Sequence, residues 1–211
     1  MSRPALIVIA KAPVPGRVKT RLCPPCTPAQ AAAIAQAALT DTLAAVAATP
    51  APRRLLALDG TPGRWLPDGF EVIPQPAGGL GDRLADAFAR AGGPAFLIGM
   101  DTPQVSPALL RHASRQLAEA DAVLGLAADG GYWGIGLRRP DPAAFAGVPM
   151  STSRTGCAQR ERLTALALSV HDLPVLRDVD TFADACAVAA RVPAGSAFAA
   201  AVAELELRAV A

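Results

Sequence analysis

The sequence predicts a three-layer α/β/α fold built on a mainly parallel, mixed sheet. Short apolar runs alternate along the chain with longer Ala-rich segments that carry helix start and stop signals. Repeated βα alternation of this kind is typical of a parallel sheet covered by helices. The chain has 211 residues, of which 52% are hydrophobic, and this fits a single domain spanning residues 1–211.

Strands are expected where apolar or β-branched runs are bounded by turn residues. The expected strands are 5–10, 54–58, 70–73, 95–99, 122–127, 132–137 and 169–176. The run 132–137 alternates only weakly, so we expect an edge or antiparallel strand there. Pro174 is expected to interrupt the last strand, because proline has no N–H to donate to a sheet.

Helices are expected where a capping residue precedes an Ala-rich or amphipathic stretch. Thr27 followed by Pro28, and Ser106 followed by Pro107, give this signal most clearly. The expected helices are 28–48, 80–91, 106–120, one that closes over 163–167, 181–190 and 196–210. The Pro- and Gly-rich segment 138–156 is expected to be a loop or flap at the active site.

Bulk properties exclude several classes of protein. A net charge of +2 gives no reason to expect a nucleic-acid or membrane-surface partner. No apolar run approaches the roughly 18 residues of a membrane span, and we expect a cytoplasmic protein. Cys23 and Cys26 have redox-motif spacing but do not follow a strand directly, so we predict no dithiol or metal role for them. His112 and His171 are isolated and are predicted to be ordinary helix or strand residues.

The loop after the first strand is the most informative segment. It carries Lys11, Arg17, Lys19 and Arg21, and Gly16 with several prolines turns it. Open α/β sheets bind ligands at the carboxyl ends of their strands. A phosphate chain is the simplest ligand that needs so many cationic donors. The alternative is a solvated basic loop at the surface.

Acidic residues follow two other expected strands. Asp101 comes directly after 95–99, and a carboxylate facing a phosphate chain needs a cation between them. Mg²⁺, or Mn²⁺ in its place, is expected there, since Mg²⁺ binds carboxylates together with substrate phosphates. The alternative is that Asp101 caps a turn. Asp178 and Asp180 follow the last strand, and we favour Asp180 as the second ligand, with helix capping beside Thr181 as its alternative.

Two glycine-rich turns complete the candidate set. Asp129, Gly130 and Gly131 precede Tyr132, and a turn with exposed N–H groups beside aromatic residues suits a sugar or phosphate group. The alternative is a plain hairpin turn. The glycine-rich segment 75–84 opens a helix, whose N–H groups can face an anion or the edge of a base. The alternative is an ordinary turn between a strand and a helix, because any such turn uses glycine.

Four of these motifs together resemble the GT-A, or nucleotide-diphospho-sugar transferase, superfamily. They are Lys-Ala-Pro-x-Pro-Gly-x-x-Lys-Thr-Arg-Leu at 11–22, Gly-x-Asp-x-Pro at 99–103, Asp-Gly-Gly-Tyr at 129–132 and Asp-x-Asp-Thr at 178–181. The pattern is most similar to a bacterial family that carries only a provisional glycosyltransferase label. That family is similar to 2-phospholactate and molybdenum-cofactor guanylyltransferases. The resemblance implies a Rossmann-like GT-A nucleotide-binding fold.

The resemblance also implies roles for individual residues. Lys11, Lys19 and Arg21 are expected to act on the donor phosphates, and Asp101 and Asp180 to bind the metal. The residues assigned to the nucleotide are Ala10, Gly16, Arg17, Thr20, Gly79, Gly81 and Arg83. Those assigned to the acceptor are Asp129, Gly130, Gly131, Tyr132, Ser151 and Thr152.

Two reactions fit this set of residues. In nucleotidyl transfer a phosphorylated acceptor attacks a nucleoside triphosphate, and we favour this reaction because a triphosphate best matches the basic loop. In glycosyl transfer a small-molecule acceptor attacks the sugar of an NDP-sugar. An alternative of another class is a nucleotide-binding regulatory module without turnover, against which Lys19, Asp101 and Asp180 argue.

Overall fold

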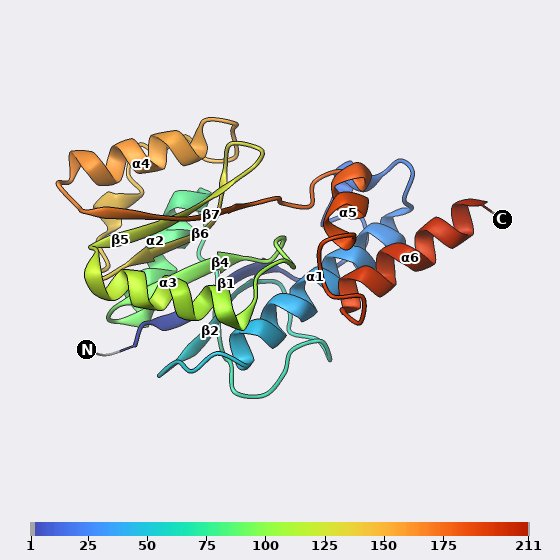
Figure 1. Cartoon of the computed structure of the whole chain (residues 1–211), viewed down its shortest axis with the longest axis horizontal. Helices are drawn as coiled ribbons and strands as arrows, with labels where there is room; N and C mark the ends of the chain where they lie inside the picture. The colour runs from blue at the N-terminus through green and yellow to red at the C-terminus, as the bar shows by residue number, and fades with distance from the viewer. Residues whose placement is uncertain (1–2, 211) are drawn as a thin grey trace.

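The computed structural model describes residues 3–210, and its centre is a seven-stranded sheet with the order β3-β2-β1-β4-β6-β5-β7 (Figure 1). The strands are β1 (Ala5–Lys11), β2 (Arg54–Asp59), β3 (Glu71–Pro74), β4 (Ala95–Gly99), β5 (Ala122–Ala127), β6 (Tyr132–Leu137) and β7 (Val170–Leu176). All neighbouring strands run parallel except at β6, which is antiparallel to both β4 and β5. The predicted mainly parallel, mixed sheet is confirmed.

Helices connect the strands and begin where the capping signals lie. They are α1 (Pro28–Ala47), α2 (Leu80–Ala91), α3 (Pro107–Glu119), α4 (Thr155–Ala165), α5 (Phe182–Ala189) and α6 (Ala197–Val210), with short 3₁₀ turns η1 (Thr20–Leu22) and η2 (Pro142–Ala144). Thr27 and Gln30 form a reciprocal capping box at the start of α1. Within residues 3–210, no helix is both long and apolar enough to cross a membrane.

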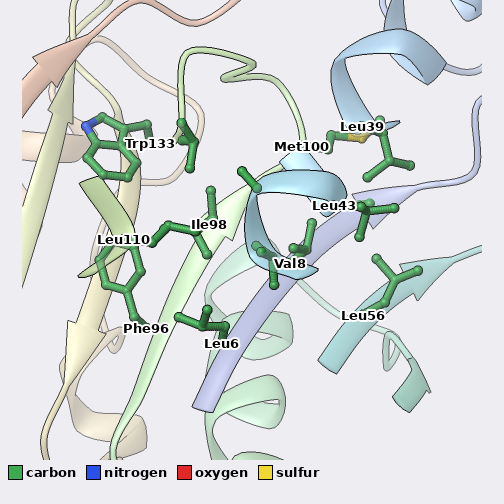
Figure 2. Close-up of a cluster of buried hydrophobic side chains, with 14 of the residues drawn as sticks. Leu6, Val8, Leu39, Leu43, Leu56, Phe96, Ile98, Met100, Leu110 and Trp133 are labelled. Carbon is green, nitrogen blue, oxygen red and sulfur yellow. The ribbon is translucent and has the colours of Figure 1, made fainter. Parts of the chain in front are cut away.

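The alternation of side chains along each strand supplies two separate cores. In β1, Leu6 and Val8 pack with α1 and α3 on one face of the sheet, as Figure 2 shows around Leu39, Leu43 and Leu110. Ile7 belongs to the core on the opposite face, with residues of α2 and α4. These two cores give the three layers that the sequence predicts.

A third core lies beside the sheet, where α5 and α6 pack against α1 (Figure 1). It contains Leu22 from η1, Val179 from the segment after β7, and Phe198 from α6. One side of α1 therefore faces the sheet and another faces this helical lobe. The lobe connects the loop after β1 to the segment after β7, although the two lie far apart in sequence.

The structure corrects three details of the predicted elements. β6 lies inside the sheet between β4 and β5, so the edge alternative is wrong and the antiparallel alternative is confirmed. Pro174 does not end β7, which lies at the edge of the sheet, but the pairing of β7 with β5 is irregular there, since Gly125 pairs with Leu173 and Ala127 with Leu176. The segment 138–156 is not all loop, since it contains η2 and the first residues of α4.

The histidines and cysteines also find specific places. His112 of α3 and His171 of β7 were expected to be isolated, but their rings lie edge to face with centroids 6.2 Å apart. All four cysteines are free thiols. Cys26 is buried in the third core, and burial, with the neighbouring Cys23, raises the pKa of its thiol. A raised pKa disfavours the reactive thiolate form.

Candidate functional site

A cavity of about 800 Å³ opens at the edge of the sheet where the parallel strands end. Its walls come from the loop after β1, the ends of β4 and β7, and the beginning of β6. β1 pairs with β2 on one side and with β4 on the other, so the chain order reverses between β1 and β4. Ligands of open α/β sheets bind at such a reversal, outside the carboxyl ends of the strands.

Lys19 lies at the centre of the polar contacts in this cavity. Its Nζ donates to Asp101 Oδ2 at 2.6 Å and to Asp180 Oδ1 at 3.0 Å. Burial alone would lower the pKa of the Lys19 ammonium, but the charges of Asp101 and Asp180 outweigh it and raise the pKa. Lys19 is therefore the shared cation of two carboxylates and not a solvated loop lysine.

Asp101 and Asp180 are both free of the capping roles that were their alternatives. Ser106 caps α3 by accepting from Leu109 N, and Thr181 forms a capping box with Asp184 at α5. The side chains of Asp101 and Asp180 point instead to Lys19, and Arg21 adds a contact of 3.3 Å to Asp180 Oδ2.

Backbone contacts bring the two aspartates together from separate parts of the chain. Val179 N donates to Asp101 O at 3.2 Å, and the Gln104 side chain donates to Arg177 O at 2.6 Å. Val179 is buried in the third core, which fixes the position of Asp180 next to it. The register that pairs Ile9 of β1 with Gly99 of β4 places the basic loop beside Asp101.

Asp178 lines the same cavity, although it was not chosen as a site residue. Burial, followed by the charges of Asp101 and Asp129, raises its pKa to about 7. The Thr102 hydroxyl donates to Asp178 Oδ1 at 3.1 Å. The alternation of Asp178 and Asp180 along the chain indicated this placement, and both side chains do reach the cavity.

The remaining cationic side chains of the cavity differ in whether an acidic side chain already contacts them. Arg83 lies 3.5 Å from Asp59, and it also donates to Gly78 O and Gln75 Oε1. Lys11 and Arg17 form no ion pair with any residue in the described range 3–210. These two exposed cations remain available to an anionic ligand.

Gln75 and Met100 hold the floor of the cavity in shape, and the sequence reasoning did not select them. The Gln75 amide donates at 2.8 Å to both Ala10 O and Ala57 O, which joins the ends of β1 and β2. Met100 Sδ accepts from the N–H of Lys11 at 3.3 Å. Gln75 stands inside the glycine-rich segment 75–84, which was the available signal for it.

The opposite wall is the turn between β5 and β6. Asp129 accepts from Gly131 N at 2.8 Å and closes the turn. Gly130 has φ +90° and accepts from Gly156 N at 2.8 Å, so the turn is fixed to the start of α4. The Tyr132 hydroxyl lies 3.3 Å from Gln159 Oε1, and burial raises the pKa of that hydroxyl.

The structure brings most of the predicted site residues to this cavity. Those that line it are Ala10, Lys11, Arg17, Lys19, Thr20, Arg21, Arg83, Asp101, Asp129, Gly131, Tyr132, Ser151, Thr152 and Asp180. Four others do not line it: Gly16, Gly79, Gly81 and Gly130. Gly79 instead begins α2, where its N–H donates to Asp82 at 3.0 Å. Binding by any of these residues stays a prediction.

The side chains present fit a divalent cation that arrives with phosphates. Within residues 3–210, no three His, Cys, Asp or Glu side chains converge as a complete metal site. Two carboxylates, Asp101 and Asp180, do converge on one positive charge, that of Lys19. Mg²⁺ is commonly held by one or two carboxylates, with substrate phosphates and water completing its shell. The donor set therefore suits Mg²⁺ or Mn²⁺ bound together with a phosphorylated ligand.

Comparison with solved structures agrees with this fold. A provisionally named nucleotide-diphospho-sugar transferase from Desulfovibrio desulfuricans G20 is 26% identical and superimposes with a TM-score of 0.89, covering 98% of this chain and 96% of that one. A CMP:2-keto-3-deoxy-manno-octonic acid synthetase complexed with CTP is 12% identical, with a TM-score of 0.55 over 90% of this chain and 97% of that one. Rv0371c from Mycobacterium tuberculosis H37Rv, solved in complex with manganese, is 21% identical, with a TM-score of 0.51 over 89% and 97%.

No curated protein sequence matches the chain. The fold is that of the nucleotide-diphospho-sugar transferase superfamily, as the resemblance implied. A family model described as "Uncharacterized protein conserved in bacteria (DUF2064)" matches residues 31–152, which is more than half of the 211 residues. The match begins after the basic loop and ends before Asp178 and Asp180. The chain belongs to this bacterial family, DUF2064.

Proposed function

We propose that this protein is a metal-dependent nucleotidyltransferase that joins a nucleoside monophosphate to a phosphorylated small molecule and releases pyrophosphate. The observation that carries the proposal is the meeting of Asp101, Asp180 and the basic loop in one cavity at the sheet edge. A volume of about 800 Å³ lies within the range of small-molecule sites, roughly 300–1,000 Å³.

The basic loop would bind the triphosphate of the donor. Lys11 and Arg17 reach the cavity without carboxylate partners in the described part of the chain, so they are the first candidates for charge-assisted hydrogen bonds to phosphate. Arg21 is 77% exposed, lines the cavity and contacts Asp180. Cations at this place would favour a transition state in which negative charge develops on the leaving pyrophosphate.

Asp101 and Asp180 would hold Mg²⁺ or Mn²⁺, which supplies charge neutralisation on the phosphate chain when it is bound. The wall formed by Asp129, Gly131 and Tyr132, with Ser151 and Thr152, would orient the acceptor on the other side of the cavity. Holding donor and acceptor in one orientation contributes to rate without further chemistry from the protein. Residues 1–211 act as one catalytic unit in this proposal.

Glycosyl transfer is the second candidate. The solved structure at 26% identity carries the name of a nucleotide-diphospho-sugar transferase, and it covers nearly the whole chain. In this case the same carboxylates and cations would neutralise a departing nucleoside diphosphate. The turn 129–132 would then face the sugar, with the aromatic Tyr132 beside it.

Calorimetric titration of the purified protein distinguishes the candidates. The ligands are ATP, GTP, CTP and UTP, and separately UDP-glucose and GDP-mannose, each with Mg²⁺. We expect one triphosphate to bind more tightly than either NDP-sugar, and Lys11→Ala to weaken that binding about tenfold, the effect of one charge-assisted hydrogen bond. Arg64→Ala, an exposed cation outside the cavity, serves as the matched control.

Each result bears on the proposal directly. Tight binding of an NDP-sugar without a triphosphate partner selects glycosyl transfer instead. Equal effects of Lys11→Ala and Arg64→Ala would show that the basic loop does not hold the nucleotide. If no nucleotide in either group binds at millimolar concentration, the proposed function is wrong.

A further inference from the structure

Lys19 differs from every other cation that lines the cavity. Its side chain is only 11% exposed, whereas that of Arg21 is 77% exposed. Its Nζ lies between the two carboxylates, at 2.6 Å from Asp101 and 3.0 Å from Asp180. Lys19 and Lys11 are also the only lysines in the sequence; Lys11 ends β1, and Lys19 lies in the loop that follows it.

The backbone holds Lys19 in this position. The residue has φ 47° and ψ 40°, a left-handed conformation that is unfavourable for a side chain with a Cβ. Its neighbours Val18 and Leu22 are buried, and Leu22 N donates to Lys19 O at 3.0 Å. The strained conformation persists because the packing on both sides fixes it, and the ammonium is thereby directed between the aspartates.

In this position the Lys19 ammonium would compete with a metal ion for the carboxylates of Asp101 and Asp180. The carboxylate oxygens that suit a divalent cation already have a positive charge between them, and two cations in one partly buried site repel strongly. A buried ammonium also cannot leave its partners unless another anion receives it. The phosphate chain of a nucleotide is such an anion, and the free cations Lys11 and Arg17 are placed to attract it.

We propose that the Lys19 ammonium occupies the place of the metal ion between Asp101 and Asp180. It thereby prevents free divalent cations from binding there and admits only a metal ion that arrives bound to a nucleotide. On binding, the ammonium moves from the carboxylates to the phosphate oxygens and the metal takes its place. Metal and nucleotide thus bind jointly, and neither binds well alone. This inference rests on the proposed function, because it requires a phosphorylated donor in the cavity.

The first test uses Mn²⁺ alone, without any nucleotide. Water-proton relaxation measures its affinity for the wild-type protein and for Lys19→Met, Lys19→Gln and Lys11→Met. We expect removal of the Lys19 charge to tighten Mn²⁺ binding at least about tenfold, since the repelling cation is gone. Lys11→Met removes the same charge from the same cavity but from no carboxylate contact, so its effect should be less than about threefold.

The second test uses the wild-type protein and needs no variant. With ¹⁵N-lysine labelling, only two lysine side chains contribute signals, and burial of the Lys19 ammonium should slow its exchange with water. Mg²⁺ alone should leave the Lys19 signal in place. Mg²⁺ with the triphosphate selected by calorimetry should shift it, because the ammonium then faces phosphate.

The outcomes separate this inference from the proposed function. Tight Mn²⁺ binding by the wild-type protein, or no gain in Lys19→Met and Lys19→Gln, overturns the role of Lys19 even if nucleotides bind. A Lys19 signal that moves with Mg²⁺ alone overturns it as well. A gain in Mn²⁺ affinity with no nucleotide binding at all supports the competition at Asp101 and Asp180 and overturns the nucleotidyltransferase proposal.

Discussion

Asp101 and Asp178 lie in the same cavity but have different partners. Asp101 contacts the Lys19 ammonium, whereas Asp178 has the Thr102 hydroxyl and is repelled by Asp101 and Asp129. Burial, followed by the charges of Asp101 and Asp129, raises the pKa of Asp178 to about 7, although the Thr102 hydrogen bond acts in the opposite direction. Asp101 and Asp180 therefore share the Lys19 ammonium, whereas Asp178, which lines the same cavity, forms no ion pair within the described residues.

Replacement of Asp101 by asparagine separates metal binding from local structure. The amide keeps the shape of the side chain but provides no negative charge for Mg²⁺. We expect Asp101→Asn to lose the Mg²⁺-linked part of nucleotide stabilisation in a thermal-shift titration. The fold itself should lose only about 1 kcal/mol, because Asp180 continues to pair with the Lys19 ammonium.

Asp86→Asn is the control for this variant. Asp86 makes an i,i+4 pair with Arg90 on α2 and does not line the cavity. Its Mg²⁺ dependence should equal that of the wild type. Undiminished Mg²⁺ dependence in Asp101→Asn would contradict the metal-ligand role.

The sequence predicted which residues meet at the site better than it predicted their contacts. Lys19, Asp101 and Asp180 were selected because loops that follow parallel strands converge at one sheet edge. The contact of Lys19 with both aspartates depends on how the loop folds between Val18 and Leu22, and no local pattern states this. Gly79 begins α2 and does not line the cavity, so its assignment to the nucleotide stays a prediction; a glycine before a helix starts the helix as readily as it approaches a ligand.

The turn between β5 and β6 depends on a glycine for two reasons. Gly130 has φ +90°, and a Cβ built there would lie 2.0 Å from Ser153 O. Gly147 has a comparable φ of +76° but open space around it. Gly147→Ala should therefore cost about 1 kcal/mol from backbone strain alone, and Gly130→Ala about 3 kcal/mol. Urea denaturation measures both, and equal losses would show that the turn accommodates a side chain.

Asp121 joins the ends of three strands at the edge of the sheet far from the site. It accepts hydrogen bonds from the backbone and hydroxyl of Ser169, before β7, and from Arg138, after β6. These hydrogen bonds hold the pKa of Asp121 well below its usual value of 3.8. A carboxyl group whose pKa is lower in the folded than in the unfolded state stabilises the fold at pH values above the unfolded-state pKa. This contribution is lost as the pH falls from the unfolded-state pKa through the folded-state pKa.

We therefore expect Asp121→Asn to be less stable than the wild type by about 1 kcal/mol at pH 7, since the group is 39% exposed and partly screened. The difference should shrink as the pH falls from about 4 towards 2, because Asp121 of the unfolded wild type takes up a proton in this range while the folded carboxylate stays ionised. Denaturation curves at pH 7, 5, 3 and 2 measure it. A constant difference across this range would assign the loss to packing.

The local sequence predicted where the strands begin and end, but it did not predict which strands pair with each other. Strands β4 and β5 have the bounds that their apolar runs predicted, because turn residues stand at both ends. The place of β6 between them is a property of the whole sheet and of glycines such as Gly134 and Gly136, which admit Phe96 beside the strand. Pairing of this kind has no signature within a single strand.

The segments that carry Arg21 and Asp180 pack together with the helical lobe formed by α5 and α6. Leu22 follows Arg21, and Val179 precedes Asp180, and both are buried in the third core with α5 and α6. The sheet supplies Asp101, while the lobe holds in place the two segments that meet it. A loss of packing in α6 should therefore reach the site, although none of the described α6 side chains lines the cavity.

Phe198→Leu and Phe88→Leu test this coupling as a matched pair. Both phenylalanines are fully buried, Phe198 in the third core and Phe88 in the core beneath α2. Each substitution should cost about 1–2 kcal/mol of stability, because each leaves a similar void.

Only Phe198→Leu should loosen the packing around Leu22 and Val179. Hydrogen exchange should then speed up by at least about tenfold at the amides of Leu22 and Val179, while Phe88→Leu leaves them near the wild-type rate. These amides report on the free protein, so the result does not depend on any nucleotide. Equal exchange in both variants would mean that the sheet alone holds the loop, and that the helical lobe has no part in positioning Lys19 and Asp180.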